Sequence, residues 1–116
     1  LLRRALANLL DNALDFSPER GTVSVDGRLH ARSVDITVRD RGPGIPVADR
    51  ERLLEPFQRR GNRSSDAGAG LGLAIARTIA EAHEGSLIAI DRPDGQRGAC
   101  LVLDLPAMAE EEDDEG

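Results

Sequence analysis

The chain contains no lysine, because all fifteen of its basic residues are arginine. This absence excludes mechanisms that depend on a lysine amine. A phosphate-binding loop of the Walker A type requires its lysine, eukaryotic-type protein kinases require a strand lysine, and Schiff-base chemistry requires a primary amine. Any phosphate bound here must therefore be held by arginine, by backbone N–H groups or by a metal ion.

Cysteine and aromatic residues are also scarce. The single cysteine, Cys100, excludes an internal disulfide, and its apolar neighbours predict a small core residue. The two phenylalanines, Phe16 and Phe57, are the only aromatic residues. No apolar run approaches the length of a membrane span, and no signal peptide opens the chain. Because the chain begins inside a helical pattern, we expect a domain from a longer protein.

The net charge of -6 comes from one end of the chain. Residues 110–115 read EEEDDE and hold six of the 21 acidic residues, so the other 15 acids balance the 15 arginines. A neutral body predicts no attraction to nucleic acid or to a membrane surface. We expect one domain over residues 1–106 and a disordered acidic tail over residues 107–116.

The periodicity of apolar residues predicts an α+β fold. Helices are predicted at residues 1–15, 48–54 and 71–83, and strands at residues 23–25, 34–38, 87–90 and 99–105. The first two strands would be joined at Asp26-Gly27 or by the longer stretch through Ala31, and the last two at Pro93-Asp94-Gly95. Because the strands come in adjacent pairs, we expect a partly antiparallel sheet with helices on one face, a two-layer sandwich.

Two asparagines interrupt the leucine-rich first helix. The predicted core face consists of Leu2, Leu6, Leu9, Leu10 and Ala13. A neighbouring stripe consists of Arg4, Asn8, Asn12 and Asp15. Both asparagines are therefore expected at the edge of the core, where an amide oxygen can bind Mg²⁺. The plainer alternative is two exposed surface amides.

Three further segments have the composition of ligand-binding loops. Residues 40–46, DRGPGIP, form a glycine-rich turn in which Asp40 can accept a hydrogen bond from an amine. Residues 68–73, GAGLGL, lead glycine-rich backbone into a helix N-terminus, which favours an anion. Residues 58–69 are predicted to be a mobile loop whose arginines close over phosphates. An ordinary turn, a hinge and a solvated loop are the respective alternatives.

Taken in order, these motifs resemble those of the ATP-binding catalytic domain of bacterial sensor histidine kinases, within the superfamily that includes gyrase and heat-shock chaperone ATPases. ANLLDNALDFSP resembles the N box, DRGPGIP the G1 box, LLEPFQRR the F box, and GAGLGLAIARTIAEAHEG the G2 box with its helix. The resemblance covers residues 1 to about 106. It implies the Bergerat-type fold, a mixed and mostly antiparallel sheet with helices on one face.

The resemblance also implies a role for each matching residue. Asn12 would carry the Mg²⁺ bound to the phosphates of ATP, with Asn8 beside it, and Asp40 would accept the adenine amino group. Arg59 or Arg63 would approach the γ-phosphate. The other implied nucleotide-binding positions are Asp15, Phe16, Gly42, Gly44, Ile45, Phe57, Gly68, Gly70, Leu71 and Gly72.

The residue at position 8 separates a kinase from a hydrolase. The ATPases of this superfamily have a water-activating glutamate there, and an amide cannot act as a general base. The resemblance therefore implies a protein-histidine kinase that transfers the γ-phosphoryl group of ATP to a histidine for relay to a response regulator. The resemblance places that histidine on a separate dimerisation domain. His30 lies in a predicted hairpin, and His83 lies at a helix end, where a structural role is expected. The implied location is the cytoplasmic side of a membrane-bound sensor.

Two positions depart from the family pattern. Asp15 replaces a residue that is usually basic and faces phosphate, and Phe16 replaces a common tyrosine or histidine. An acid near phosphates would repel them unless it turns away or assists the metal. These departures leave open the alternative of a degenerate nucleotide-binding regulatory module with the same fold.

Overall fold

The computed structural model describes residues 1–18, 21–56 and 71–106. The helices are α1 (Leu2–Phe16), the short 3₁₀ helix η1 (Val47–Asp49), α2 (Arg50–Leu53) and α3 (Gly72–Ala82). The strands are β1 (Ser24–His30), β2 (Ser33–Arg39), β3 (Ser86–Ile90) and β4 (Cys100–Pro106). The segments predicted as a mobile loop and as an acidic tail lie outside the described residues.

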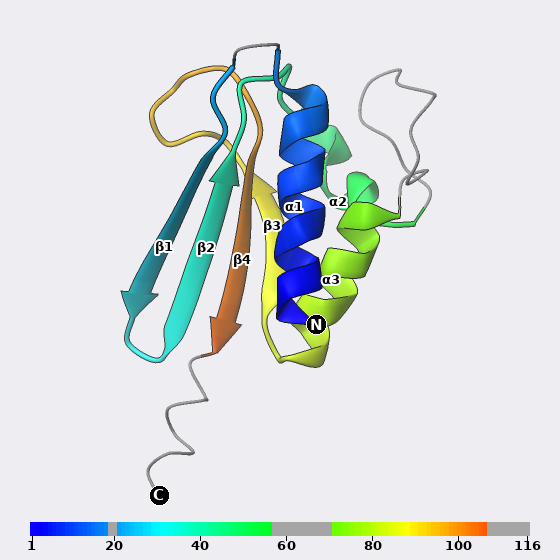
Figure 1. The fold of residues 1–116 in the computed structure, drawn as a ribbon. Coiled ribbons are helices and arrows are strands. Elements are labelled where there is room, and N and C mark those ends of the chain that lie inside the picture. The colour runs from blue at the N-terminus through cyan, green and yellow to red at the C-terminus, as the bar shows by residue number, and fades with distance from the viewer. Residues whose placement is uncertain (19–20, 57–70, 107–116) are drawn as a thin grey trace, which may run out of the picture.

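The strands form one layer, and the helices lie together on one of its faces (Figure 1). The strand order is β1-β2-β4-β3, and all three pairings within the described part of the chain are antiparallel. The predicted two-layer α+β fold is therefore confirmed. The parallel component of a mixed sheet does not occur among these residues.

The sheet places apolar side chains of neighbouring strands opposite one another on the helix-covered face. Val38 pairs with Leu101, Ile36 with Leu103 and Val34 with Leu105. Four of these residues, Val38, Leu101, Leu103 and Leu105, belong to the main buried cluster together with residues of α1 and α3. This strict alternation fixes the register, because a shift by one residue would turn every one of these side chains toward solvent.

The turn between β1 and β2 lies at one of the two predicted positions. β1 continues through Asp26 and Gly27, and the turn lies at Ala31-Arg32, where Ala31 has a φ of +45°. Gly27 instead pairs with Ile36 inside the ladder. The prediction of a turn at Asp26-Gly27 is therefore wrong. The pairing of the whole strand outweighs the local preference of Asp-Gly for a turn.

α1 is buried along a stripe that differs from the predicted one. The fully buried residues are Ala5, Leu9 and Ala13. Leu6 and Leu10 are half-buried beside this stripe, whereas Leu2 is 38% exposed, so its placement in the core is wrong. The small side chains on the buried stripe share a cluster with the equally small Ala76 and Ala80 of α3, which lets the two helices pack closely.

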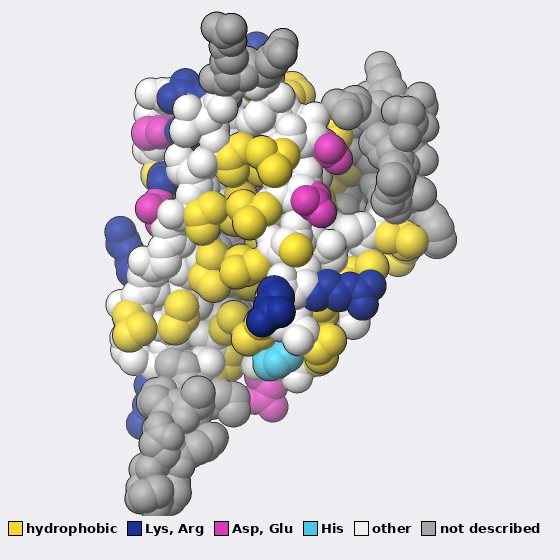
Figure 2. Space-filling view, in the orientation of Figure 1, with side chains coloured by type: hydrophobic (Ala, Val, Ile, Leu, Met, Phe, Trp, Pro, Cys, Tyr) yellow, Lys and Arg dark blue, Asp and Glu magenta, His cyan; other side chains and the backbone are white. Residues whose placement is uncertain are grey.

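Apolar side chains continue along the flank of α1 toward the first two strands (Figure 2). At the β1 edge of the sheet, Val25 is 49% exposed and Leu29 is 70% exposed. α1 packs on β2, and α3 packs on β3 and β4. The helix layer therefore shields the centre of the sheet better than its β1 edge.

α3 ends in a Schellman motif. The N–H of Gly85 donates to the Ala80 carbonyl at 2.8 Å, and the N–H of Glu84 donates to the Glu81 carbonyl at 2.9 Å. Glu84, with a φ of +65°, occupies the left-handed position that glycine usually takes. A Cβ atom on Gly85 would lie 2.0 Å from the Asp104 carbonyl oxygen, so the close approach to β4 requires glycine.

Cys100 is fully buried, as predicted, and burial raises the pKa of its thiol above the ordinary value. No helix in the described part of the chain combines the length and the apolar character needed to cross a membrane.

Candidate functional site

The C-terminal end of α1 packs directly against the glycine-rich turn that follows β2. A Cβ atom on Gly42 would lie 2.3 Å from the carbonyl oxygen of Phe16, so only glycine fits at this position. The backbone N–H of Arg41 donates a hydrogen bond to Ser17 Oγ, with 3.5 Å between the nitrogen and the oxygen. The structure thus brings together Phe16 and Gly42, which were predicted to belong to one site.

The first asparagine of α1, Asn8, lies next to the start of α3. A Cβ atom on Gly72 would lie 3.9 Å from Asn8 Cβ and 4.0 Å from its Cγ, which is ordinary contact. Asn8 Nδ2 is buried and has no hydrogen-bond partner among the described residues. Asn12, one turn further along α1, is half-buried. Because an unpaired buried amide is costly, Asn8 is suited to bind a ligand.

The start of α3 adds backbone donors to this position. Leu71 is the N-cap residue and makes no side-chain hydrogen bond to the helix. The first N–H groups of an α-helix have no partner within the helix, and the helix dipole favours an anion at this end. A buried amide beside an uncapped helix N-terminus is an arrangement that can hold a phosphate group.

Asp40 is buried, at 2% exposure, and is fixed from several directions. Its Oδ1 accepts hydrogen bonds from the N–H of Gly42 and from the N–H of Ala99, both at 2.9 Å. Its own N–H donates to the Ala99 carbonyl at 3.0 Å. The carboxylate is therefore held in one orientation by the backbone, as recognition of a specific donor requires.

Gly44 and Ile45 continue the turn away from Asp40. Gly44 has a φ of +86°, which only glycine adopts without strain. Ile45 is 7% exposed and packs in a small apolar cluster with Leu53 and Ala99. Ile45 thus anchors the turn to α2.

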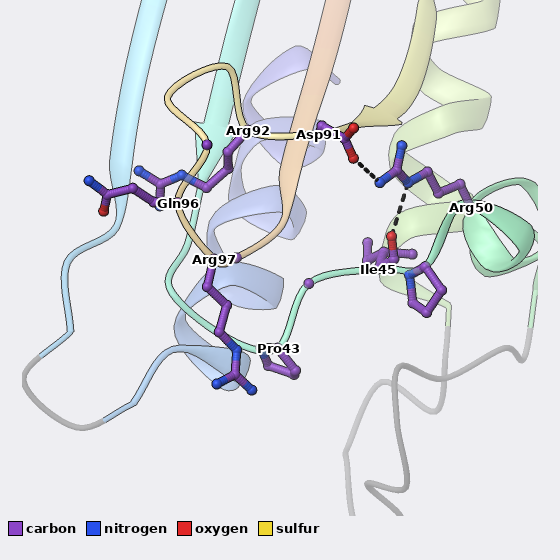
Figure 3. A pocket seen from close by; sticks show the side chains of 11 residues that line it. Pro43, Ile45, Arg50, Asp91, Arg92, Gln96 and Arg97 are labelled. Atoms are coloured by element: carbon purple, nitrogen blue, oxygen red, sulfur yellow. Dashed lines mark hydrogen bonds and ion pairs between the residues drawn. The ribbon is translucent and has the colours of Figure 1, made fainter.

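A cleft of about 500 Å³ lies on the other side of this turn, between it and the β3–β4 loop (Figure 3). Of the predicted site residues it includes only Gly44 and Ile45. Two of its arginines are already paired, because Arg50 binds Asp91 at 2.6 Å and Arg92 binds Asp94. The cleft is therefore distinct from the surface around Asn8, which has the unpaired buried amide.

Sequence reasoning missed the β3–β4 loop as a support for Asp40. Gly98 has a φ of +134°, and a Cβ atom there would lie 1.8 Å from the Asp40 carbonyl oxygen. Arg92 Nη1 donates to the same oxygen at 2.8 Å. The hydrogen bond that Arg92 Nη2 donates to Asp94 Oδ2 lowers the pKa of the Asp94 carboxyl from 3.8 to about 2. The available sequence signal was Gly98, two residues before β4.

The remaining predicted residues have mixed outcomes. Asp15 is an exposed residue of the last turn of α1. Five predicted positions lie outside the described residues, namely Phe57, Arg59, Arg63, Gly68 and Gly70. Within the described part of the chain, no group of three or more His, Cys, Asp or Glu side chains could hold a metal ion.

The fold and this site define a nucleotide-binding domain, and comparison with known proteins identifies its kind. Residues 1–109 match the family described as histidine kinase-, DNA gyrase B- and HSP90-like ATPase. The chain therefore belongs to this family. Within the family, it is an ATP-binding catalytic domain of the sensor histidine kinase type.

Three similar proteins illustrate this relationship. The chain is 45% identical to the sensor protein KdpD of Mycobacterium tuberculosis over 107 residues, which are 92% of this chain and 12% of KdpD. The mycobacterial sensor histidine kinase MprB aligns with a TM-score of 0.79 and 35% identity, over 89% of this chain and 70% of that one. Full-length ShkA in complex with AMPPNP aligns with a TM-score of 0.74 and 31% identity, over 90% of this chain and 21% of the ShkA chain. The chain spans only 12–27% of curated relatives such as KdpD and SenX3.

Proposed function

We propose that this chain binds Mg-ATP and presents its γ-phosphoryl group to a histidine side chain of another domain of the same protein. The observation that carries this proposal is the buried Asn8 Nδ2, which has no partner among the described residues and lies beside Gly72 at the start of α3. A phosphate oxygen is an acceptor that would satisfy this amide and the first N–H groups of the helix together. The ShkA structure, which contains AMPPNP, is consistent with a nucleotide at this fold.

Asp40 is proposed to recognise the base. Its carboxylate is buried and fixed by two backbone donors, so an amino group that approaches it meets an acceptor of defined direction. The adenine amino group is such a donor. Gly42 lies beside Asp40, and any side chain there would collide with Phe16, which keeps this wall of the site flat.

Asn12 is proposed as the protein ligand of the metal ion. Mg²⁺ prefers oxygen ligands, keeps several waters and is commonly shared with substrate phosphates, so one amide oxygen suits it. When bound, Mg²⁺ would neutralise charge on the phosphate oxygens.

The described residues near the proposed phosphates favour transfer to a histidine over hydrolysis. Asn8 occupies the position from which a glutamate would activate water, and its amide cannot accept that proton. In the transfer, a histidine nitrogen forms a bond to the γ-phosphorus, and the bond to the β–γ bridging oxygen breaks with release of ADP. Such transfer depends mainly on positioning and on charge neutralisation. Arg59 or Arg63 would contribute charge, and a response regulator would then receive the phosphoryl group.

Calorimetric titration with ATP, with and without Mg²⁺, tests this proposal. We expect the chain to bind ATP more tightly with Mg²⁺, and Asn12→Ala to weaken Mg-dependent binding about tenfold or more while the fold stays intact. Asp11→Ala is the matched control, because Asp11 is the exposed neighbour on the same helix. The proposal fails if neither heat nor a thermal shift appears at millimolar ATP. Steady phosphate release that Asn8→Ala abolishes would instead identify a hydrolase.

A further inference from the structure

Arg92, in the loop between β3 and β4, makes three hydrogen bonds through its guanidinium group. Its Nε donates to Asp94 Oδ1 at 3.0 Å and its Nη2 to Asp94 Oδ2 at 2.6 Å, which is a bidentate pair. Its Nη1 donates to the backbone carbonyl of Asp40 at 2.8 Å. The side chain of Arg92 is only 7% exposed, whereas that of Asp94 is 39% exposed, so the contact with the Asp40 carbonyl is the more shielded of the two. Arg92 thus ties the loop to the end of β2.

The loop that holds Arg92 is itself rigid. The N–H of Gln96 donates to Asp94 Oδ1 at 3.0 Å, and the N–H of Gly95 donates to the Arg92 carbonyl at 3.0 Å. A turn closed in this way keeps Asp94 in place. Asp94 in turn orients the guanidinium, so that Nη1 is aimed at a fixed point before any ligand arrives.

The Asp40 carbonyl belongs to the Asp40–Arg41 peptide, whose N–H donates to Ser17 Oγ. A rotation of this peptide would displace the backbone that follows it, including the N–H of Gly42, which donates to the Asp40 carboxylate at 2.9 Å. Arg92 donates to the Asp40 carbonyl oxygen, and Gly98 lies close against the same oxygen. The N–H of Ala99 donates to the Asp40 carboxylate. The direction of the Asp40 carboxylate therefore depends on contacts from the loop between β3 and β4.

We propose that Arg92, held by Asp94, is a positioning residue that sets how strongly Asp40 discriminates a purine with a 6-amino group. This inference rests on the proposed function, because it assumes that Asp40 accepts the adenine amino group. Arg92 touches no phosphate-binding residue in the described part of the chain. Its loss should therefore weaken recognition of the base and spare recognition of the phosphates.

Another arginine of the cleft beside the loop, Arg97, provides a matched control for Arg92 (Figure 3). Arg97 belongs to the same loop and lines the same cleft, but it is exposed and has no ion pair or hydrogen bond among the described residues. Arg97→Ala removes the same charge without touching Asp40. A difference between Arg92→Ala and Arg97→Ala therefore reports on position and not on net charge.

The test compares the affinity for ATP with that for purine riboside triphosphate, which lacks the 6-amino group. The unmodified chain and Arg97→Ala should bind ATP about tenfold more tightly than this analogue, because one hydrogen bond to a charged acceptor is lost. In Arg92→Ala the ratio of the affinity for ATP to that for the analogue should fall toward one. Most of this change should come from weaker binding of ATP. Arg92→Lys, which retains one donor and serves if Arg92→Ala does not fold, should restore part of the ratio.

The outcomes separate this inference from the function on which it rests. If the unmodified chain binds neither nucleotide, the proposed function fails, and the inference fails with it. If the unmodified chain prefers ATP, and Arg92→Ala and Arg92→Lys both keep that preference, Arg92 has only a structural role and the inference alone is wrong. Equal binding of both nucleotides by the unmodified chain would remove Asp40 from base recognition and overturn the inference while ATP binding stands.

Discussion

At the scale of single residues, two acids on either side of the site have opposite environments. Asp40 is the one charged residue among those described that is fully buried, and two backbone N–H groups offset the cost of that burial. Asp15 is exposed at the C-terminal end of α1, where the helix dipole disfavours an acid. Only Asp40 has the fixed geometry that selective binding requires. Asp15, which replaces the basic residue usual in the family, is therefore in contact with solvent.

Replacing Asp94 with asparagine should change stability in a way that depends on pH. The carboxyl of Asp94 has a pKa of about 2 in the folded chain, below its ordinary value of 3.8, mainly because Arg92 donates to it. A group whose pKa is lowered by folding stabilises the folded state above its unfolded pKa, and this effect is lost as the pH falls through the folded value. The free energy of unfolding should thus differ between the two chains by a constant amount above about pH 5.

Urea denaturation at a series of pH values checks this expectation. The difference between the unmodified chain and Asp94→Asn should shrink between about pH 4 and pH 2, where the carboxylate becomes protonated. Asp91→Asn is a useful comparison, because Asp91 pairs with Arg50 at the same cleft and is 83% exposed in its side chain. A difference that persists unchanged at pH 2 would show that the ion pair does not stabilise the fold.

The grouping of the candidate site residues was predictable where the pattern is local in the sequence. The spacing of Asn8 and Asn12 places both on one side of a helix, and the glycines around Gly42 and Gly72 indicate close approach of backbone. The support from Arg92 was not predictable in this way, since it contacts a carbonyl 52 residues earlier in the chain. Such a contact depends on the packing of two loops, which no local pattern records.

At the scale of elements, glycines in and beside the strands give a sharp test of packing. Gly85→Ala would place a Cβ atom 2.0 Å from the Asp104 carbonyl, so the end of α3 or the β3–β4 pairing must shift. We expect the free energy of unfolding to fall by about 1–3 kcal/mol. The control is Gly27→Ala, because a Cβ atom there meets nothing within 4 Å, and it should change stability by no more than about 0.5 kcal/mol.

Thermal and urea denaturation of both variants provides the measurement. Equal stability of the two variants would mean that the contact between Gly85 and Asp104 does not constrain the fold. Backbone signals of β4 should move in the spectrum of Gly85→Ala and stay in place for Gly27→Ala. Shifts confined to β1 in both variants would also contradict the expectation.

The elements themselves were predicted unevenly. α3 was predicted to within one residue at each end, because its apolar residues keep a helical period along its whole length. η1 and α2 divide the segment that was predicted as a single short helix. β1 was predicted too short, since Asp26-Gly27 has the composition of a turn. The pairing of Gly27 with Ile36 overrides that composition, because the ladder and the buried face of β2 reward a longer strand.

At the scale of the whole molecule, the two halves of the proposed site come from different layers. α1 and α3 supply the phosphate side, and the ends of β2 and β4 supply Asp40 and its supports. The packing of α1 on α3 and on β2 therefore determines the distance between the two sides. A change that loosens the helix layer should weaken nucleotide binding without touching any residue of the site.

Hydrogen exchange should follow the order of the strands. β4 is paired on both sides and its leucines lie in the main core, so its amides should open only with global unfolding. β1 is paired only with β2 among the described strands, and Val25 and Leu29 are exposed, so alternate amides of β1 should exchange much faster. Exchange measured by NMR at two protein concentrations provides the test. If β1 is as well protected as β4 at both concentrations, the edge is covered within one chain and the expected order is wrong; if its protection disappears on dilution, a second copy pairs with that edge.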